Sequence, residues 1–145
     1  MNIERLKAQI REHEGFRNKA YPDTLGNWTI GVGHLIKLPD EEYLINIRLK
    51  DYEVEHIFNT DLNQAIDDAR KFVDEKLIHE EAFEIIVDMA FNLGLTRLSQ
   101  FKKFQQALIN NNYEKASEEM LDSRWAKQLP YRSKKLADKM RSINA

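Results

Sequence analysis

The stretch from Glu14 to His34 constrains the fold of this 145-residue chain more than any other. Before it, apolar residues recur at helical spacing, and Gly15 is the kind of residue that ends a helix in the left-handed conformation. Tyr21 precedes a proline and must be extended, and the residues after the proline have the composition of a tight turn. The run from Trp28 to Gly33 mixes β-forming residues with glycines, which suits a strand that another group must approach closely. The sequence therefore predicts a helix that ends at Glu14 and is followed by a hairpin.

Glu14, at the end of this predicted helix, has an unusual electrostatic position. The carboxy-terminal end of a helix carries partial negative charge, which disfavours an ionised carboxylate there and holds its proton more tightly. A carboxyl group that keeps its proton can act as an acid. Taken alone, Glu14 could also be an ordinary surface glutamate. Two residues that follow it have ordinary structural interpretations as well: Asp23 could be a turn residue that accepts from backbone N–H groups, and Thr29 could be a good strand former.

Glu14, Asp23 and Thr29 are separated by eight and by five residues. This spacing reproduces the Glu-Asp-Thr pattern of the phage-type lysozymes, glycoside hydrolase family 24, and the chain resembles the T-even bacteriophage members of that family. The resemblance extends over nearly all of the chain, and its segments come in the same order. The other matching segments are Thr29–His34, Phe58–Asp61, Phe91–Gly94, Ser123–Trp125 and Pro130–Arg132.

Apolar periodicity predicts helices over about 51–72 and over 79–93, with Gly94 as the stop of the second. Capping residues or a first-turn proline predict further helices after Ser99, after Asn112 and from Pro130, and a short one over 123–126. Residues 35–39 read as a third short strand, whereas residues 40–50 fit no single pattern. Helices dominate and one small sheet lies near the start, so the predicted class is α+β.

The resemblance implies a lysozyme-like fold in which a small N-terminal β-hairpin lobe and a larger helical C-terminal lobe are joined by a long helix. We expect a single domain over residues 1–145. Within it, residues 14–50 would form the small lobe, residues 1–13 and 73–145 the helical lobe, and residues 51–72 the linking helix.

Composition excludes some classes of chemistry. The chain has no cysteine, so disulfides and a thiol nucleophile are excluded. Its amino-terminal residues are charged and amphipathic, and no apolar run approaches the ~20 residues of a membrane span, so we expect neither a signal peptide nor stable membrane insertion.

The charge is distributed unevenly. Residues 1–94 carry a net charge of −8 and residues 95–145 a net charge of +6. The basic half could face an anionic polymer such as cell wall or nucleic acid, or it could simply be a solvated helical surface. No basic run interleaved with aromatic residues favours stacking on nucleic acid, so we expect no nucleic-acid partner.

Hydrolysis of a glycosidic bond needs a proton for the leaving oxygen and help for the attacking water, which is why two carboxyl groups flank the bond. The resemblance implies that Glu14 is the proton donor and that Asp23 and Thr29 together hold the water, which gives inversion at the anomeric carbon. It also implies that Arg132 pairs with the catalytic glutamate, although a plain surface arginine is the alternative.

Several other residues are implicated by the resemblance. His34 and Asp61 would form a structural ion pair rather than bind a metal, since the other histidines lack paired zinc-ligand spacing. Two of the implied substrate-binding positions, Phe104 and Glu119, depart from the T-even pattern, which has a serine and an asparagine there. Trp125 is expected to pack rather than to stack on sugar. The full set of implied substrate-binding residues is Leu35, Phe91, Phe104 and Glu119, of which Phe91 could equally belong to the core.

The resemblance therefore implies an endolysin with muramidase activity, which hydrolyses the β-1,4 bond between N-acetylmuramic acid and N-acetylglucosamine in peptidoglycan and needs neither a cofactor nor a metal. It would be a monomer that accumulates in the host cytoplasm and reaches the wall after a holin permeabilises the membrane. The alternatives are a lytic transglycosylase, in which a hydroxyl of the sugar replaces water, and a non-catalytic wall-binding or nucleic-acid-binding helical module.

Overall fold

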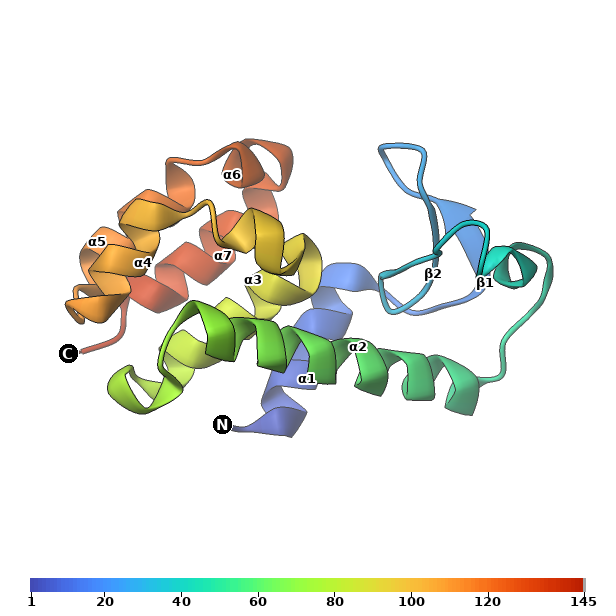
Figure 1. Ribbon diagram of the computed structural model, residues 1–145, viewed down its shortest axis with the longest axis horizontal. Helices are drawn as coiled ribbons and strands as arrows, with labels where there is room; N and C mark the ends of the chain where they lie inside the picture. The colour runs from blue at the N-terminus through green and yellow to red at the C-terminus, as the bar shows by residue number, and fades with distance from the viewer. Residues whose placement is uncertain (145) are drawn as a thin grey trace. The chain divides into compact units, whose positions relative to one another are not determined.

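Helices dominate residues 1–144, the part of the chain that the computed structural model describes (Figure 1). The α+β class predicted from the sequence is confirmed, and the arrangement is lysozyme-like. In chain order the elements are α1 (Ile3–Glu14), β1 (Arg17–Pro22), β2 (Trp28–Gly31), β3 (His34–Leu35), the 3-10 helix η1 (Glu42–Asn46), α2 (Asp51–Phe72), the 3-10 helix η2 (Glu75–Leu77), α3 (Glu80–Leu98), α4 (Lys102–Ile109), α5 (Tyr113–Leu121), α6 (Arg124–Gln128) and α7 (Pro130–Arg141).

The chain divides into two compact units. One consists of Ile3–Gln64, and the other combines Met1–Asn2 with Ala65–Ala145. Helix α2 contributes its first residues to one unit and its last residues to the other. The sequence-based lobe boundaries at residues 14–50 and 73–145 stay a prediction. Among the described residues, no helix combines the length and the apolar character needed to cross a membrane.

The unit of residues 3–64 contains a three-stranded antiparallel sheet in the order β1-β2-β3. Tyr21 of β1 pairs with Thr29 of β2, and Thr29 pairs in turn with Leu35 of β3. Thr29 therefore lies on the central strand. Two residues, Val32 and Gly33, connect β2 to β3, and the side chain of Val32 is buried.

The predicted strand over residues 35–39 is wrong in its extent, because β3 ends at Leu35. From Lys37 the chain turns back on itself: the Glu41 N–H donates to the Lys37 carbonyl, and the Lys37 N–H donates to the Glu41 carboxylate at 2.9 Å. These bonds use backbone groups that a strand would offer to its neighbour. Residues 40–50, for which no pattern was found, contain η1 and a bridge from Arg48 to Lys19 of β1.

The other unit is helical and is built around α3. Phe83, Ile86 and Met89 of this helix are each 1% exposed or less. At Gly94 the backbone leaves the helical conformation, with φ 76° and ψ 166°, as the predicted stop requires, and a further helical segment then runs to Leu98.

The predicted helix starts in this unit are also found. The Asn112 side chain accepts from Lys115 N at the start of α5, and Ser123 caps α6. Pro130 opens α7, where the missing N–H of a proline costs nothing. The helix predicted after Ser99 begins at Lys102 without a side-chain cap.

Candidate active site

Glu14 is the last residue of α1, and its carboxyl group lies against the turn between β2 and β3. Gly15 ends the helix with φ 82°, and its N–H donates to the Arg11 carbonyl at 2.8 Å. A Cβ atom added to Gly33 would lie 1.9 Å from Oε2 of Glu14, so the two residues are in direct contact. The half-buried carboxyl group of Glu14 thus faces the glycine-rich segment that the sequence predicted another group would approach.

Asp23 organises the turn between β1 and β2 with one of its two carboxylate oxygens. Oδ1 accepts from Leu25 N at 2.9 Å and from Asn27 N at 2.8 Å. Within the described residues, Oδ2 has no hydrogen-bond donor. Asp23 therefore has the structural role expected of a turn aspartate and still offers one oxygen to water.

Thr29 is 6% exposed and lies on the central strand. Its hydroxyl donates to the Asn27 carbonyl at 3.2 Å, which leaves the lone pairs of Oγ1 to accept from another donor. The N–H of Asn27 donates to Asp23, and the carbonyl of Asn27 accepts from Thr29. Asn27 therefore connects the Thr29 hydroxyl to the turn that contains Asp23.

Tyr21 links the two candidate carboxyl groups electrostatically. Burial raises the pKa of Tyr21 above its ordinary value, the negative charges of Glu14 and Asp23 raise it further, and Arg17 opposes the rise. The guanidinium carbon of Arg17 lies 4.5 Å from the centre of the Tyr21 ring. Glu14 and Asp23 are thus both close enough to one phenol on β1 to affect its ionisation.

Arg132 of α7 forms a buried pair with Asp88 of α3. Its Nε and one terminal nitrogen donate to Oδ1 of Asp88 at 2.9 and 2.7 Å, and the Asp88 side chain is 0% exposed. The surface-arginine alternative is therefore wrong, because Arg132 is only 6% exposed. Its predicted pairing with Glu14 stays a prediction, because Glu14 belongs to the other unit.

His34 lies between two carboxylates of its own unit. Nδ1 is 2.7 Å from Oδ2 of Asp61, which gives the predicted pair, and Nε2 is 3.0 Å from Oε1 of Glu41. The hydrogen bond to Asp61 is the main cause of a raised His34 pKa; burial opposes the rise and Glu41 adds to it. For Glu41, burial opposes ionisation, but the Lys37 N–H and His34 outweigh it and lower the pKa.

The four predicted substrate-binding residues differ in exposure. Leu35 on β3 is 54% exposed, and Phe91 on α3 is half-buried. Phe104 is 1% exposed and stacks on Phe72 with ring centres 6.0 Å apart. Phe104 can therefore line a pocket but offers almost no surface to a sugar.

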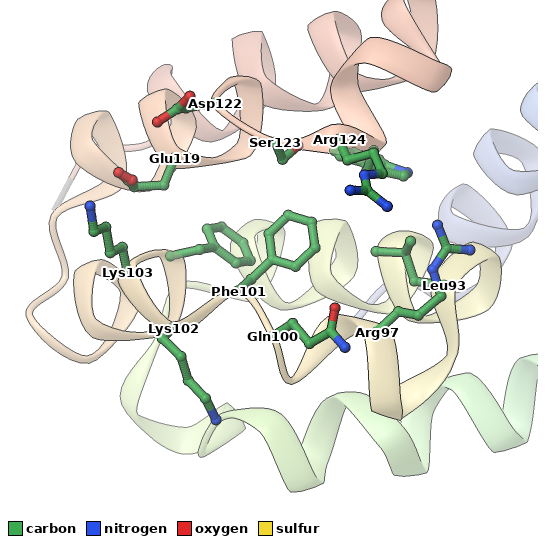
Figure 2. A pocket seen from close by; sticks show the side chains of 12 residues that line it. Leu93, Arg97, Gln100, Phe101, Lys102, Lys103, Glu119, Asp122, Ser123 and Arg124 are labelled. Atoms are coloured by element: carbon green, nitrogen blue, oxygen red, sulfur yellow. The ribbon is translucent and has the colours of Figure 1, made fainter.

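Phe104 and Glu119 do line one pocket of about 650 Å³ within the helical unit, shown in Figure 2. Side chains from α4 form one wall and side chains from α5 and α6 the opposite wall. Trp125, which also lines the pocket, is buried, as predicted, and its indole N–H donates to Asn92 at 3.1 Å. The charged residues of the pocket are Arg97, Lys102, Lys103, Glu119, Asp122 and Arg124.

Residues 1–144 contain no group of three or more histidine, aspartate and glutamate side chains arranged to hold a metal ion. The carboxylates around His34 satisfy its two ring nitrogens, so this cluster is a hydrogen-bonded structural unit.

The sequence of this chain matches a known protein family. A model of the phage lysozyme family matches residues 11–141. The chain belongs to the phage lysozyme family. The part of the chain that matches the phage lysozyme model includes Glu14, Asp23 and Thr29, together with Arg132.

Relatives of this phage lysozyme family member include proteins of phages and of Dictyostelium discoideum. Probable T4-type lysozyme 2 of Dictyostelium discoideum is 27% identical over 156 residues, which cover 92% of each chain. Endolysin of Salmonella phage P22 is 25% identical over 114 residues, or 79% of this chain and 77% of that protein. Peptidoglycan hydrolase gp36 of Pseudomonas phage phiKMV is 24% identical over 92% of this chain, which corresponds to 15% of gp36.

Four residues of interest were missed by the sequence reasoning. The sequence indicates only an extended backbone at Tyr21, before a proline, although a tyrosine between two candidate acids is a visible signal. In the sequence, Gly33 is only one of several glycines. Glu41 lies in the segment without a pattern, and Asp88 is a charged residue on a helix whose face was otherwise read as apolar, which should have suggested a buried partner.

Proposed function

We propose that this protein is a peptidoglycan-hydrolysing endolysin that acts as a muramidase. It would cleave the β-1,4 bond between N-acetylmuramic acid and N-acetylglucosamine by inversion. Glu14 would be the general acid, and Asp23 and Thr29 would hold and activate the attacking water.

The chemistry follows from what each group can donate or accept. As the general acid, the Glu14 carboxyl group gives a proton to the glycosidic oxygen as the bond to the anomeric carbon breaks. The free Oδ2 of Asp23 accepts a proton from water while the Thr29 hydroxyl orients that water. Water then forms the new bond to the anomeric carbon from the face opposite the leaving oxygen, and the configuration inverts.

The observation that carries this proposal is the arrangement around β2 in the unit of residues 3–64. Glu14 contacts the turn at the end of β2. Thr29 lies on β2 and pairs with Tyr21 of β1. The negative charges of both Glu14 and Asp23 raise the pKa of Tyr21. Membership of the phage lysozyme family supports the same assignment. Its relatives named endolysin and peptidoglycan hydrolase support peptidoglycan as the substrate.

The biological setting is part of the same proposal. An endolysin of this kind would act on the wall from the host cytoplasm once a holin had opened the membrane, and host lysis would follow. Release of reducing sugar should then require an opened or chemically permeabilised membrane in whole cells, but not in purified wall.

Replacement of Glu14 by glutamine tests the acid role. General acid catalysis contributes about 10²–10⁴-fold, so Glu14→Gln should lower the release of reducing ends from purified peptidoglycan by at least about 10²-fold. The circular dichroism spectrum should not change, because the substitution is isosteric. Glu12→Gln, at an exposed position of the same helix, is the matched control and should keep wild-type activity.

Three outcomes would count against the proposal. A Glu14→Gln variant with wild-type turnover would remove Glu14 from the acid role. Wall binding by the wild-type protein without any released product would favour the non-catalytic wall-binding alternative. Binding of DNA that weakens steeply with salt would favour the nucleic-acid-binding alternative.

A further inference from the structure

We propose that Gly33 is a positioning residue for the candidate acid: because it has no side chain, the Glu14 carboxyl group can occupy the space beside the β2–β3 turn. This inference rests on the proposed function of Glu14 and adds a residue that no sequence motif assigns to the reaction.

The contact is close and involves the whole end of the glutamate side chain. A Cβ atom at Gly33 would lie 1.9 Å from Oε2, 2.7 Å from Cδ and 3.0 Å from Cγ of Glu14. Distances below 3.0 Å between such atoms are not compatible with van der Waals packing, so one partner would have to move. With glycine at position 33, the Glu14 carboxyl group occupies the space that the Cβ atom of any other residue would take.

The turn is anchored on both sides of Gly33. Val32 is 1% exposed, so its side chain anchors the turn in the core of its unit. His34 on the other side pairs with Ile30 across the hairpin and bonds to both Asp61 and Glu41. The Glu14 side chain has three rotatable bonds and lies at the end of a helix, so a methyl group at position 33 would displace the carboxyl group rather than the turn.

The same segment provides a matched control. Gly31 and Gly33 have nearly the same left-handed backbone, with φ of 69° and 64°, so alanine suffers a similar backbone penalty at each position. A Cβ atom at Gly31 would instead lie 3.3 Å from Cγ1 of Val54, away from Glu14. The two alanine variants thus share a similar backbone penalty, and only the one at position 33 places its Cβ atom against Glu14.

Steady-state kinetics on soluble, uncrosslinked peptidoglycan strands test the proposal. Since a displacement of about 1 Å in a catalytic group can cost 10²-fold in rate, Gly33→Ala should lower kcat by about 10²-fold and change KM by less than about twofold. Gly31→Ala should keep kcat within about threefold of the wild type. In a Glu14→Gln background, Gly33→Ala should have almost no further effect on kcat, because the acid it would displace is already absent.

A second readout does not depend on activity. In protein labelled with ¹³C at the glutamate side-chain carboxyl carbons, the Glu14 resonance should move in Gly33→Ala and stay in place in Gly31→Ala. Gly33→Asn is a second variant in case the alanine variant folds poorly, since asparagine tolerates the left-handed conformation better and still adds a Cβ atom.

Equal losses of kcat in the alanine variants at positions 31 and 33, or an unmoved Glu14 resonance in a folded variant at position 33, would overturn the positioning role. If the wild-type protein shows no hydrolysis but the Glu14 resonance still moves, the positioning contact stands and the proposed function fails.

Discussion

At the scale of single residues, His34 connects three segments of the unit of residues 3–64 through hydrogen bonds to two carboxylates. Its imidazole joins the hairpin, through β3, to Asp61 on α2 and to Glu41 in the segment before η1. The sequence resemblance supplied Asp61, but nothing in the sequence pointed to Glu41, because that segment has no hydrophobic period. The structure therefore shows a three-residue cluster where a pair was predicted.

The raised His34 pKa has a consequence for stability. The unfolded-state pKa is about 6.5, so the stabilisation from the charged imidazole is complete below about pH 6.5 and is lost as pH rises through the higher folded-state pKa. The lowered Glu41 pKa adds stabilisation that is present above its unfolded value of about 4.5 and is lost as pH falls. The contribution of the cluster should therefore be largest between about pH 4.5 and 6.5.

Urea unfolding of His34→Asn across this range tests the cluster. Hydrogen bonds to charged groups contribute about 1.5–3 kcal/mol, and partial exposure to solvent reduces this, so a loss of about 1–2 kcal/mol is expected near pH 6. The loss should shrink above neutral pH. His56→Asn, at an exposed position on α2, is the control and should show no such trend. A His34→Asn deficit that grows between pH 7 and 9 would contradict this account.

The glycines of the β2–β3 turn show how far single residues could be predicted. The mixture of β-forming residues and glycines predicted that another group would approach this segment, and the contact between Glu14 and Gly33 confirms it. Which group approaches which glycine could not be predicted, because it depends on where α1 ends relative to the sheet in three dimensions.

At the scale of elements, Gly94 determines the shape of α3. Its φ of 76° and ψ of 166° fall in a region that only glycine adopts readily, and this break allows a second helical segment to begin at Leu95. Leu93 and Arg97, on either side of the break, both line the pocket in Figure 2. The glycine was predicted as a helix stop, but the helical turn after it was not, because four residues are too few for a periodic signal.

Replacement of Gly94 by alanine should therefore destabilise the protein through its backbone alone. Among the described residues, apart from its chain neighbours and its own helix backbone, no atom lies within 4 Å of a Cβ atom added there, so the cost is that of the disfavoured conformation, about 1–3 kcal/mol. Thr96→Ala, at an exposed position just beyond the break, should change stability by less than about 0.5 kcal/mol. Chemical denaturation measures the free energy of unfolding of both variants. Equal losses would show that alanine at position 94 suffers no special backbone strain.

The third strand shows the opposite limit of sequence reasoning. Residues 35–39 are apolar enough to read as a strand, but the bonds between Lys37 and Glu41 turn the chain away after Leu35. Such a local side-chain bond to the backbone competes with the sheet and leaves no periodic signal.

At the scale of the whole molecule, the class and family could be predicted from the sequence because many matching segments occur in the same order. Helix α2 was also predicted with its observed bounds, since 22 residues carry a clear apolar period. Two lobes joined by a linking helix were predicted, but the boundary between residues 64 and 65 was not, because it falls inside α2, whose apolar period continues without a break. The buried Arg132–Asp88 pair was missed for a related reason, because it joins residues 44 positions apart in the chain.

The configuration of the first-formed product tests the central claim most directly. We expect ¹H NMR of soluble peptidoglycan strands during digestion to show the α-anomer of the new reducing N-acetylmuramic acid first, because water held by Asp23 and Thr29 inverts a β-linked carbon. Mass spectrometry of the same digest should show the addition of one water for each bond cleaved. The β-anomer appearing first, or anhydro-muropeptides formed without water as in a lytic transglycosylase, would contradict it.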